Sequence, residues 1–183
     1  SRIDFIDEIL NSQSKMINDL VNNNISIIHK PYNQRILKLF NNHFKKIKHN
    51  NSQLYSLLNI NQKGLTNNLL NTAKILLWDQ IGSGTVEAFA NNIPSIIYWK
   101  RIYSKEAAWS EKEINQLQNC GILHDNTDSL IFEIKKYIND PEKWLIDNNK
   151  VKAIKSFCIS YAKYDINWYN KWKEKIIKLS NEY

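Results

Sequence analysis

Residues 75–98 read ILLWDQIGSGTVEAFANNIPSIIY, and this stretch decides the fold. Residues 75–78 and 95–98 are short, mainly apolar runs bounded by turn-forming residues, which is typical of buried strands. The glycine-containing loop Asp79–Gly84 follows the first run, and Thr85–Asn91 has helical character. A strand, a helix and a second strand in succession predict one unit of a parallel α/β sheet.

The same alternation continues on both sides of this unit. Further strands are expected at residues 25–28, 54–58 and 121–123, and further helices at 3–20, 34–47, 65–72, 111–119, 128–139, 151–163 and 167–179. We therefore predict an α/β fold over residues 1–150, a Rossmann-like parallel sheet with flanking helices. Residues 151–183 are predicted to form a helical C-terminal tail.

The composition fits a single domain. A chain of 183 residues with 43% hydrophobic residues and six tryptophans can bury a core. No apolar run approaches the roughly 18 residues that a membrane span requires. Cys120 and Cys158 make no disulfide framework, which indicates a reducing, cytoplasmic compartment. The chain begins with neither Met nor a signal peptide, so we expect it to be a piece of a longer protein.

The net charge of +7 predicts mild attraction to anionic ligands or to an anionic membrane face. Lys, Asn and Ile share AT-rich codons and are all abundant, which explains much of the lysine excess. The basic residues are spread over several helices without interleaved aromatic residues. We therefore predict no nucleic-acid partner.

Ligands of open parallel sheets bind beyond the carboxyl ends of the strands. This rule selects four places that should meet at one edge: residues 29–31, 79–85, 99–101 and 124–125.

The loop at residues 79–85 is the strongest of the four. Gly82 and Gly84 let backbone amides approach an anion, and the following helix adds about half a positive charge at its N-terminus. Ser83 and Thr85 can cap the helix or bind a phosphate oxygen. The alternative is an ordinary strand–helix turn with a hydroxyl cap. The loop lacks the Gly-Lys-Ser/Thr of a Walker A motif and the third glycine of a dinucleotide fingerprint.

Glu87 lies on the first turns of the same helix. Its carboxylate either complements the helix dipole or accepts hydrogen bonds from two ribose hydroxyls of a nucleotide whose phosphates lie on the loop.

Residues 82–97 resemble the donor-site signature of GT-B glycosyltransferases, in which a small-residue loop holds the diphosphate and a Glu holds the ribose. More narrowly, residues 77–178 are similar to a family of transferases of bacterial surface-carbohydrate biosynthesis. The pieces that carry this similarity are residues 90–99, 120–125 and 157–162, and the pair Trp168 and Trp172.

This resemblance implies the C-terminal, donor-binding half of a two-domain enzyme whose N-terminal domain is missing from the chain. A nucleotide-sugar would be the donor substrate, and a surface polysaccharide or its lipid-linked precursor the acceptor, at the inner face of the membrane. It implies no cofactor and no metal, and the spacing of the acidic residues 125 and 128 does not match an Asp-x-Asp motif. No catalytic base can be named.

Three further residues are expected to add positive charge near the donor phosphates: His29, Lys30 and Arg101. His29-Lys30-Pro31 resembles, with one inserted residue, the His-Pro element of transferases that use CMP-activated sugars. A structural role for His29 and a solvated position for Arg101 are the alternatives.

The last predicted helix carries an apolar stripe of Trp168, Trp172, Ile176 and Leu179. It is expected to pack on this domain or on the missing N-terminal domain, or, uncovered, to associate.

Two other functions remain open from the sequence. One is a different enzyme on the same scaffold, a nucleotide-sugar epimerase or a glycerophosphotransferase. The other is a non-catalytic module that binds nucleotides or nucleic acid.

Overall fold

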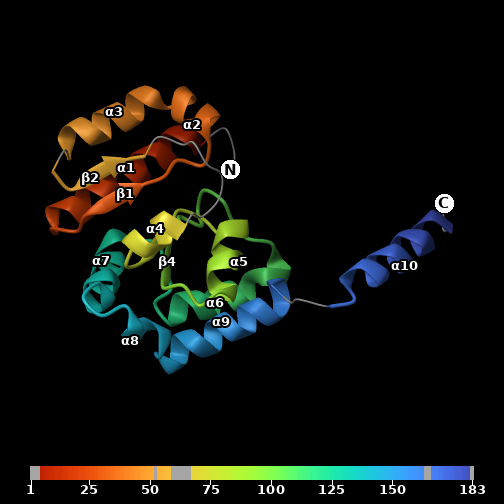
Figure 1. The fold of residues 1–183 in the computed structure, drawn as a ribbon. Helices are drawn as coiled ribbons and strands as arrows, with labels where there is room; N and C mark the ends of the chain where they lie inside the picture. Colours follow the sequence, from red (N-terminus) through yellow and green to blue (C-terminus); the bar gives the residue numbers. More distant parts are fainter. Residues whose placement is uncertain (1–4, 52, 59–66, 163–165, 182–183) are drawn as a thin grey trace.

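The strands of the described residues form two small parallel sheets flanked by helices (Figure 1). The structure, a computed structural model, describes residues 5–51, 53–58, 67–162 and 166–181. Strands β1 (Ile27–His29) and β2 (Tyr55–Leu57) pair in one sheet. Strands β3 (Leu76–Trp78), β4 (Ser95–Tyr98) and β5 (Leu123–His124) form the other, with β4 in the middle. The predicted α/β class is confirmed, although the expected single sheet is divided into two.

The N-terminal sheet is covered by α1 (Ile6–Asn22), α2 (Gln34–Leu39) and α3 (Asn41–Asn50). One continuous helix is the sequence-based expectation for residues 34–47, and this is wrong. The helix breaks at Phe40, which has φ −107° and ψ 25° and serves as the C-cap of α2 and the N-cap of α3.

The remaining helices follow the predicted order. They are α4 (Asn67–Thr72), α5 (Ser83–Ala90), α6 (Glu111–Asn119), α7 (Thr127–Tyr137), α8 (Glu142–Leu145), α9 (Asn148–Tyr161) and α10 (Trp168–Asn181), with a 3-10 turn at Ala108–Ser110. The turn and α8 are not foreseen from the sequence. Residues 3, 4, 65, 66 and 163, which the sequence assigns to helices, lie outside the described residues.

Strand β4 separates two apolar cores. Ile96 and Tyr98 face the core that α1, α3 and α7 cover, whereas Ile97 faces the core beneath α5, α6 and α9. All four residues of β4 are buried, because successive side chains point to opposite faces of a strand and helices lie on both faces here.

Helix α1 joins the two sheets into one body. Ser12 Oγ lies 3.3 Å from the hydroxyl of Tyr98 on β4. Further along the helix, the Thr127 hydroxyl at the start of α7 donates to Asp19 at 2.6 Å. These bonds and the shared core fix α1 and the N-terminal sheet on the second sheet.

A buried ion pair anchors α9. Lys150 is 1% exposed, and its Nζ lies 2.6 Å from the Glu133 carboxylate on α7. The same ammonium group donates to the Cys120 carbonyl at 2.5 Å. Breaking such a pair leaves an uncompensated buried charge, which typically costs about 3–5 kcal/mol.

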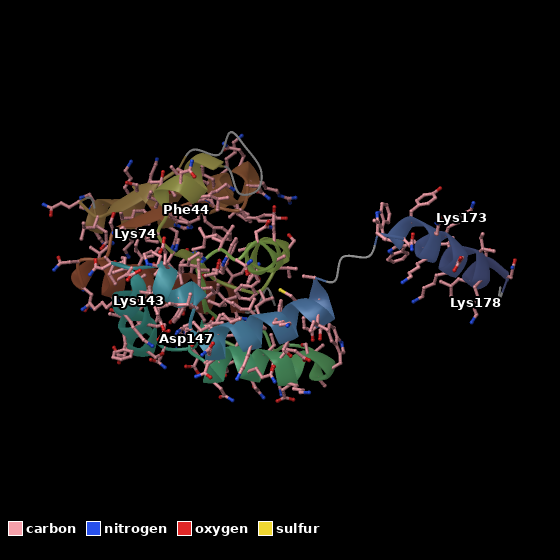
Figure 2. The ribbon with its side chains drawn as sticks, turned by 60° about the horizontal axis from the view of Figure 1, so that its bottom comes forward. Phe44, Lys74, Lys143, Asp147, Lys173 and Lys178 are labelled. Carbon is pink, nitrogen blue, oxygen red and sulfur yellow. The ribbon has the colours of Figure 1, made fainter. Side chains whose placement is uncertain are left out.

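Helix α10 stands apart from this body (Figures 1 and 2). Helix α9 packs back on the domain through Ala153 and Phe157, whereas no residue of α10 is buried. Across the part of the chain that the structure describes, no helix is long and apolar enough to cross a membrane.

Candidate nucleotide-binding site

The loop after β3 leads directly into α5. Gly82 is the N-cap residue with an extended backbone, φ −146° and ψ −172°, and the helix begins at Ser83. The amides of Ser83, Gly84 and Thr85 bond no acceptor among the described residues. They are the first N–H groups of a helix, which have no partner within it, and they point toward its N-terminal end. The geometry is therefore that of an anion-binding helix terminus.

The Thr85 hydroxyl bonds the backbone of its own loop and does not face open space. It is fully buried, donates to the Gln80 carbonyl at 3.2 Å and accepts from the Gly82 amide at 3.4 Å. Of the two hydroxyl groups predicted to reach a phosphate, only that of Ser83 belongs to an exposed residue.

The two glycines of the loop have different roles. A Cβ at Gly82 would meet nothing within 4 Å, so the space over the helix terminus is open there. A Cβ at Gly84 would lie 2.8 and 2.9 Å from two ring atoms of Trp78. Gly84 thus lets α5 pack against the end of β3, and this contact explains its presence without a ligand.

Glu87 lies one turn into α5 and is exposed. Its carboxylate makes no hydrogen bond or ion pair to any residue in the described ranges. A side chain in this position is available to a ligand held at the helix terminus, so its ribose-binding role stays a prediction.

His29 is engaged on the other sheet. Its Nδ1 lies 2.6 Å from the Tyr55 hydroxyl, and its ring meets those of Phe44 and Tyr55 edge-on. Burial, with a smaller contribution from His43, lowers the pKa of His29 to about 4. The ring is therefore neutral at pH 7 and carries no charge for a phosphate. Lys30 follows it and is half-buried.

Arg101 is bound within the protein. Its guanidinium forms a bidentate ion pair with Glu106, and one terminal nitrogen donates to Asn115 and Gln118 on α6, both at 2.9 Å. This bond to Arg101 lowers the pKa of the Glu106 carboxyl. The arrangement fixes the loop after β4 on α6.

His124 at the end of β5 is likewise satisfied. Its Nε2 donates to the Gly121 carbonyl, and its Nδ1 accepts from the Ser129 hydroxyl, each at 3.0 Å. The tautomer follows from the carbonyl, which can only accept.

The structure therefore brings together one part of the predicted site. Gly82, Ser83, Gly84, Thr85 and Glu87 form a contiguous terminus on α5. Within the described ranges, no hydrogen bond or ion pair joins this terminus to His29, Lys30 or Arg101. In the same ranges, no group of three or more His, Cys, Asp or Glu residues is placed to hold a metal ion.

Two residues that shape this region are missed from the sequence. Trp78 lies beneath Gly84, and Glu106 holds Arg101. The only available signals were a tryptophan directly before the glycine loop and a carboxylate five residues after the arginine. Neither signal is specific.

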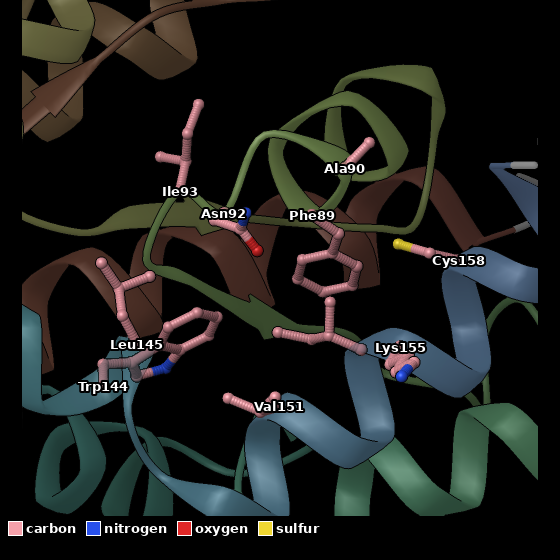
Figure 3. Close-up of a pocket in the computed structure, with 10 residues that line it drawn as sticks. Phe89, Ala90, Asn92, Ile93, Trp144, Leu145, Val151, Lys155 and Cys158 are labelled. Atoms are coloured by element: carbon pink, nitrogen blue, oxygen red, sulfur yellow. The ribbon is translucent and has the colours of Figure 1, made fainter. Parts of the chain in front are cut away.

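A cavity of about 270 Å³ lies at the opposite end of α5 (Figure 3). Its walls are mostly apolar and come from the end of α5 and from α8 and α9, including Phe89, Ile93, Trp144, Val151 and Ile154. It is separate from the N-terminal loop of α5.

Comparison with known proteins identifies the family of the chain. The profile of the LIC12162 family transferases matches residues 4–176. The chain belongs to this family. As a LIC12162 family transferase it falls in a class of enzymes that move a chemical group from a donor to an acceptor. No curated protein and no solved structure matches the chain significantly.

Proposed function

We propose that this LIC12162 family transferase binds the nucleotide-activated sugar of a glycosyl transfer at the N-terminus of α5. The acceptor would be a surface polysaccharide or its lipid-linked precursor. The observation that carries the proposal is the set of unpaired amides of Ser83, Gly84 and Thr85 directly after β3, with the exposed Glu87 carboxylate one turn further along.

These groups suit the two ends of a nucleoside diphosphate. The amides and the helix dipole favour the diphosphate, and their charge is greatest within the first turn. Glu87 lies about 5 Å beyond Gly84 along the helix axis, because three residues separate them and each adds a rise of about 1.5 Å. A carboxylate at that position can accept hydrogen bonds from both ribose hydroxyls, whereas phosphates would be repelled from it.

The same terminus supports departure of the diphosphate. Oriented amides that face a developing negative charge need no reorganisation during the reaction, which makes them effective stabilisers of a leaving group. In the proposed GT-B-type reaction they do this without a bound metal, as the resemblance of residues 82–97 implies.

The family assignment also bears on the two other enzyme functions left open by the sequence, an epimerase and a glycerophosphotransferase. An epimerase is not a transferase, so membership of the LIC12162 family favours group transfer over epimerisation. A glycerophosphotransferase is a transferase and differs in its donor. Product analysis with CDP-glycerol and with nucleotide-sugars in parallel separates these two reactions.

Calorimetry with UDP, GDP, dTDP and CMP tests the proposal, using wild type, Glu87→Gln and the matched control Glu111→Gln. Glu111 is an exposed carboxylate in the first turn of α6, and within the described residues no hydrogen bond or ion pair joins it to the loop. We expect Glu87→Gln to weaken binding of the preferred nucleotide by about 1–3 kcal/mol, the range for losing a charge-assisted hydrogen bond. The control should bind as wild type does. Equal affinity of both variants and wild type would refute the role of Glu87.

A further inference from the structure

Helix α10 presents a large apolar surface that no other part of the described chain covers. Trp168, Trp172 and Ile176 are 56%, 62% and 58% exposed. Figure 2 shows the helix away from the body of the molecule. Soluble proteins rarely leave such a contiguous apolar surface exposed, so it indicates an interaction.

The side chains of α10 are ordered around its axis. At 100° per residue, one arc of about 100° contains Trp168, Tyr169, Trp172, Ile176 and Leu179. Asn170, Glu174 and Asn181 occupy the opposite side, together with the 49% exposed Ile177. Lys173 borders the apolar arc on one side, Lys175 and Lys171 border it on the other, and Lys178 lies nearer to Glu174.

This order differs from that of a helix with a purely solvated polar face. Lysines beside an apolar arc can extend their ammonium groups toward water while their alkyl chains remain in an apolar layer. Tryptophan and tyrosine are enriched at the boundary between lipid headgroups and acyl chains. Four lysines and one glutamate also give α10 a net charge of +3.

We propose that α10 lies flat in the headgroup region of an anionic membrane, with its tryptophan arc toward the acyl chains. Apolar burial and attraction to anionic lipids act together in such helices, and each lysine near the surface adds about 1 kcal/mol. This attachment is independent of the proposed donor site on α5.

The charges on α10 argue against a second copy of the chain as the partner that covers its apolar arc. Two α10 helices related by a two-fold axis would bring the lysines that border one arc close to those that border the other. Glu174 is within ion-pair reach of Lys171 and Lys178 on its own helix, but it does not offset the repulsion between Lys173 of one helix and Lys175 of the other.

Vesicle co-sedimentation of the whole chain tests the proposal, with phosphatidylcholine vesicles that contain or lack phosphatidylglycerol. We expect at least about tenfold stronger partitioning into the anionic vesicles, reduced by added salt. Trp172→Glu should lower partitioning at least about tenfold. The double variant Lys173→Glu/Lys175→Glu should lose the preference for anionic vesicles.

Phe132→Glu is the matched control, because Phe132 is a 70% exposed aromatic residue on α7. Its partitioning should equal that of wild type. Circular dichroism should show all variants folded, since the substituted side chains are outside both cores. Equal partitioning of wild type and Trp172→Glu would overturn the proposal. So would a dimer in sedimentation velocity that Trp172→Glu dissociates, combined with no binding to vesicles.

Discussion

The residues that surround the predicted site divide into those engaged by the fold and those left available. The His29 ring, the Thr85 hydroxyl and the Arg101 guanidinium each bond protein atoms. Within the described residues, the amides of Ser83, Gly84 and Thr85 and the Glu87 carboxylate do not. Sequence reasoning selected all of these residues by type and position, yet His29 bonds Tyr55 on β2, and Arg101 bonds Asn115 and Gln118 on α6. Such long-range pairs cannot be read from a local pattern.

His29 should make stability depend on pH. Its pKa is about 4 in the folded protein and 6.5 when unperturbed, so the unfolded chain binds more protons between these values. The free energy of unfolding therefore falls as the pH drops from about 6.5 to about 4, by about 2–3 kcal/mol for this residue. Urea unfolding of wild type and His29→Gln between pH 7 and 4.5 measures the difference.

The matched control for that experiment is His49→Gln, which changes an exposed histidine on α3. The control should keep the pH dependence of wild type, whereas His29→Gln should reduce it and leave the contributions of His43 and His124, whose pKa values burial also lowers. The carboxylates with lowered pKa values, Asp19, Glu106 and Asp147, lose their contribution at lower pH and leave this window to the histidines. An unchanged slope in His29→Gln would show that the ring is solvated.

At the scale of elements, local signals locate most of the fold. Each strand in the described residues overlaps a predicted apolar run, β1 and β5 with shifted bounds, and α6 has the predicted bounds. The break at Phe40 escapes detection because Ile36, Phe40, Phe44 and Ile47 keep helical spacing through it. Helix α8 escapes because four residues are too few to show a period.

The contact between α5 and β3 leads to a prediction for the two glycines of the loop. Gly84→Ala should lower the free energy of unfolding by about 1–3 kcal/mol, because its Cβ would overlap the Trp78 ring. Gly82→Ala should leave stability nearly unchanged, because its Cβ enters open space and its backbone is extended. Urea unfolding of both variants compares them. Equal losses would mean that the Trp78 ring moves aside without cost.

At the scale of the whole molecule, the sequence predicts the class but not the assembly. Which strands pair depends on contacts between distant residues, so one continuous sheet and two small sheets have the same local pattern. The position of α10 likewise depends on contacts that a local pattern does not specify. Its apolar arc predicts a helix that packs on something, but the stripe does not specify the partner.

Titration of the ¹⁵N-labelled chain with nucleoside diphosphates, followed by amide NMR shifts, tests the donor-site proposal most directly. A diphosphate bound at the N-terminus of α5 changes the hydrogen bonding of Ser83, Gly84 and Thr85. We predict that these three amides show the largest shifts, that they saturate together, and that Glu87→Gln raises the concentration required. Saturating shifts confined to the cavity beside Trp144, or no shift at the three amides, would contradict the account.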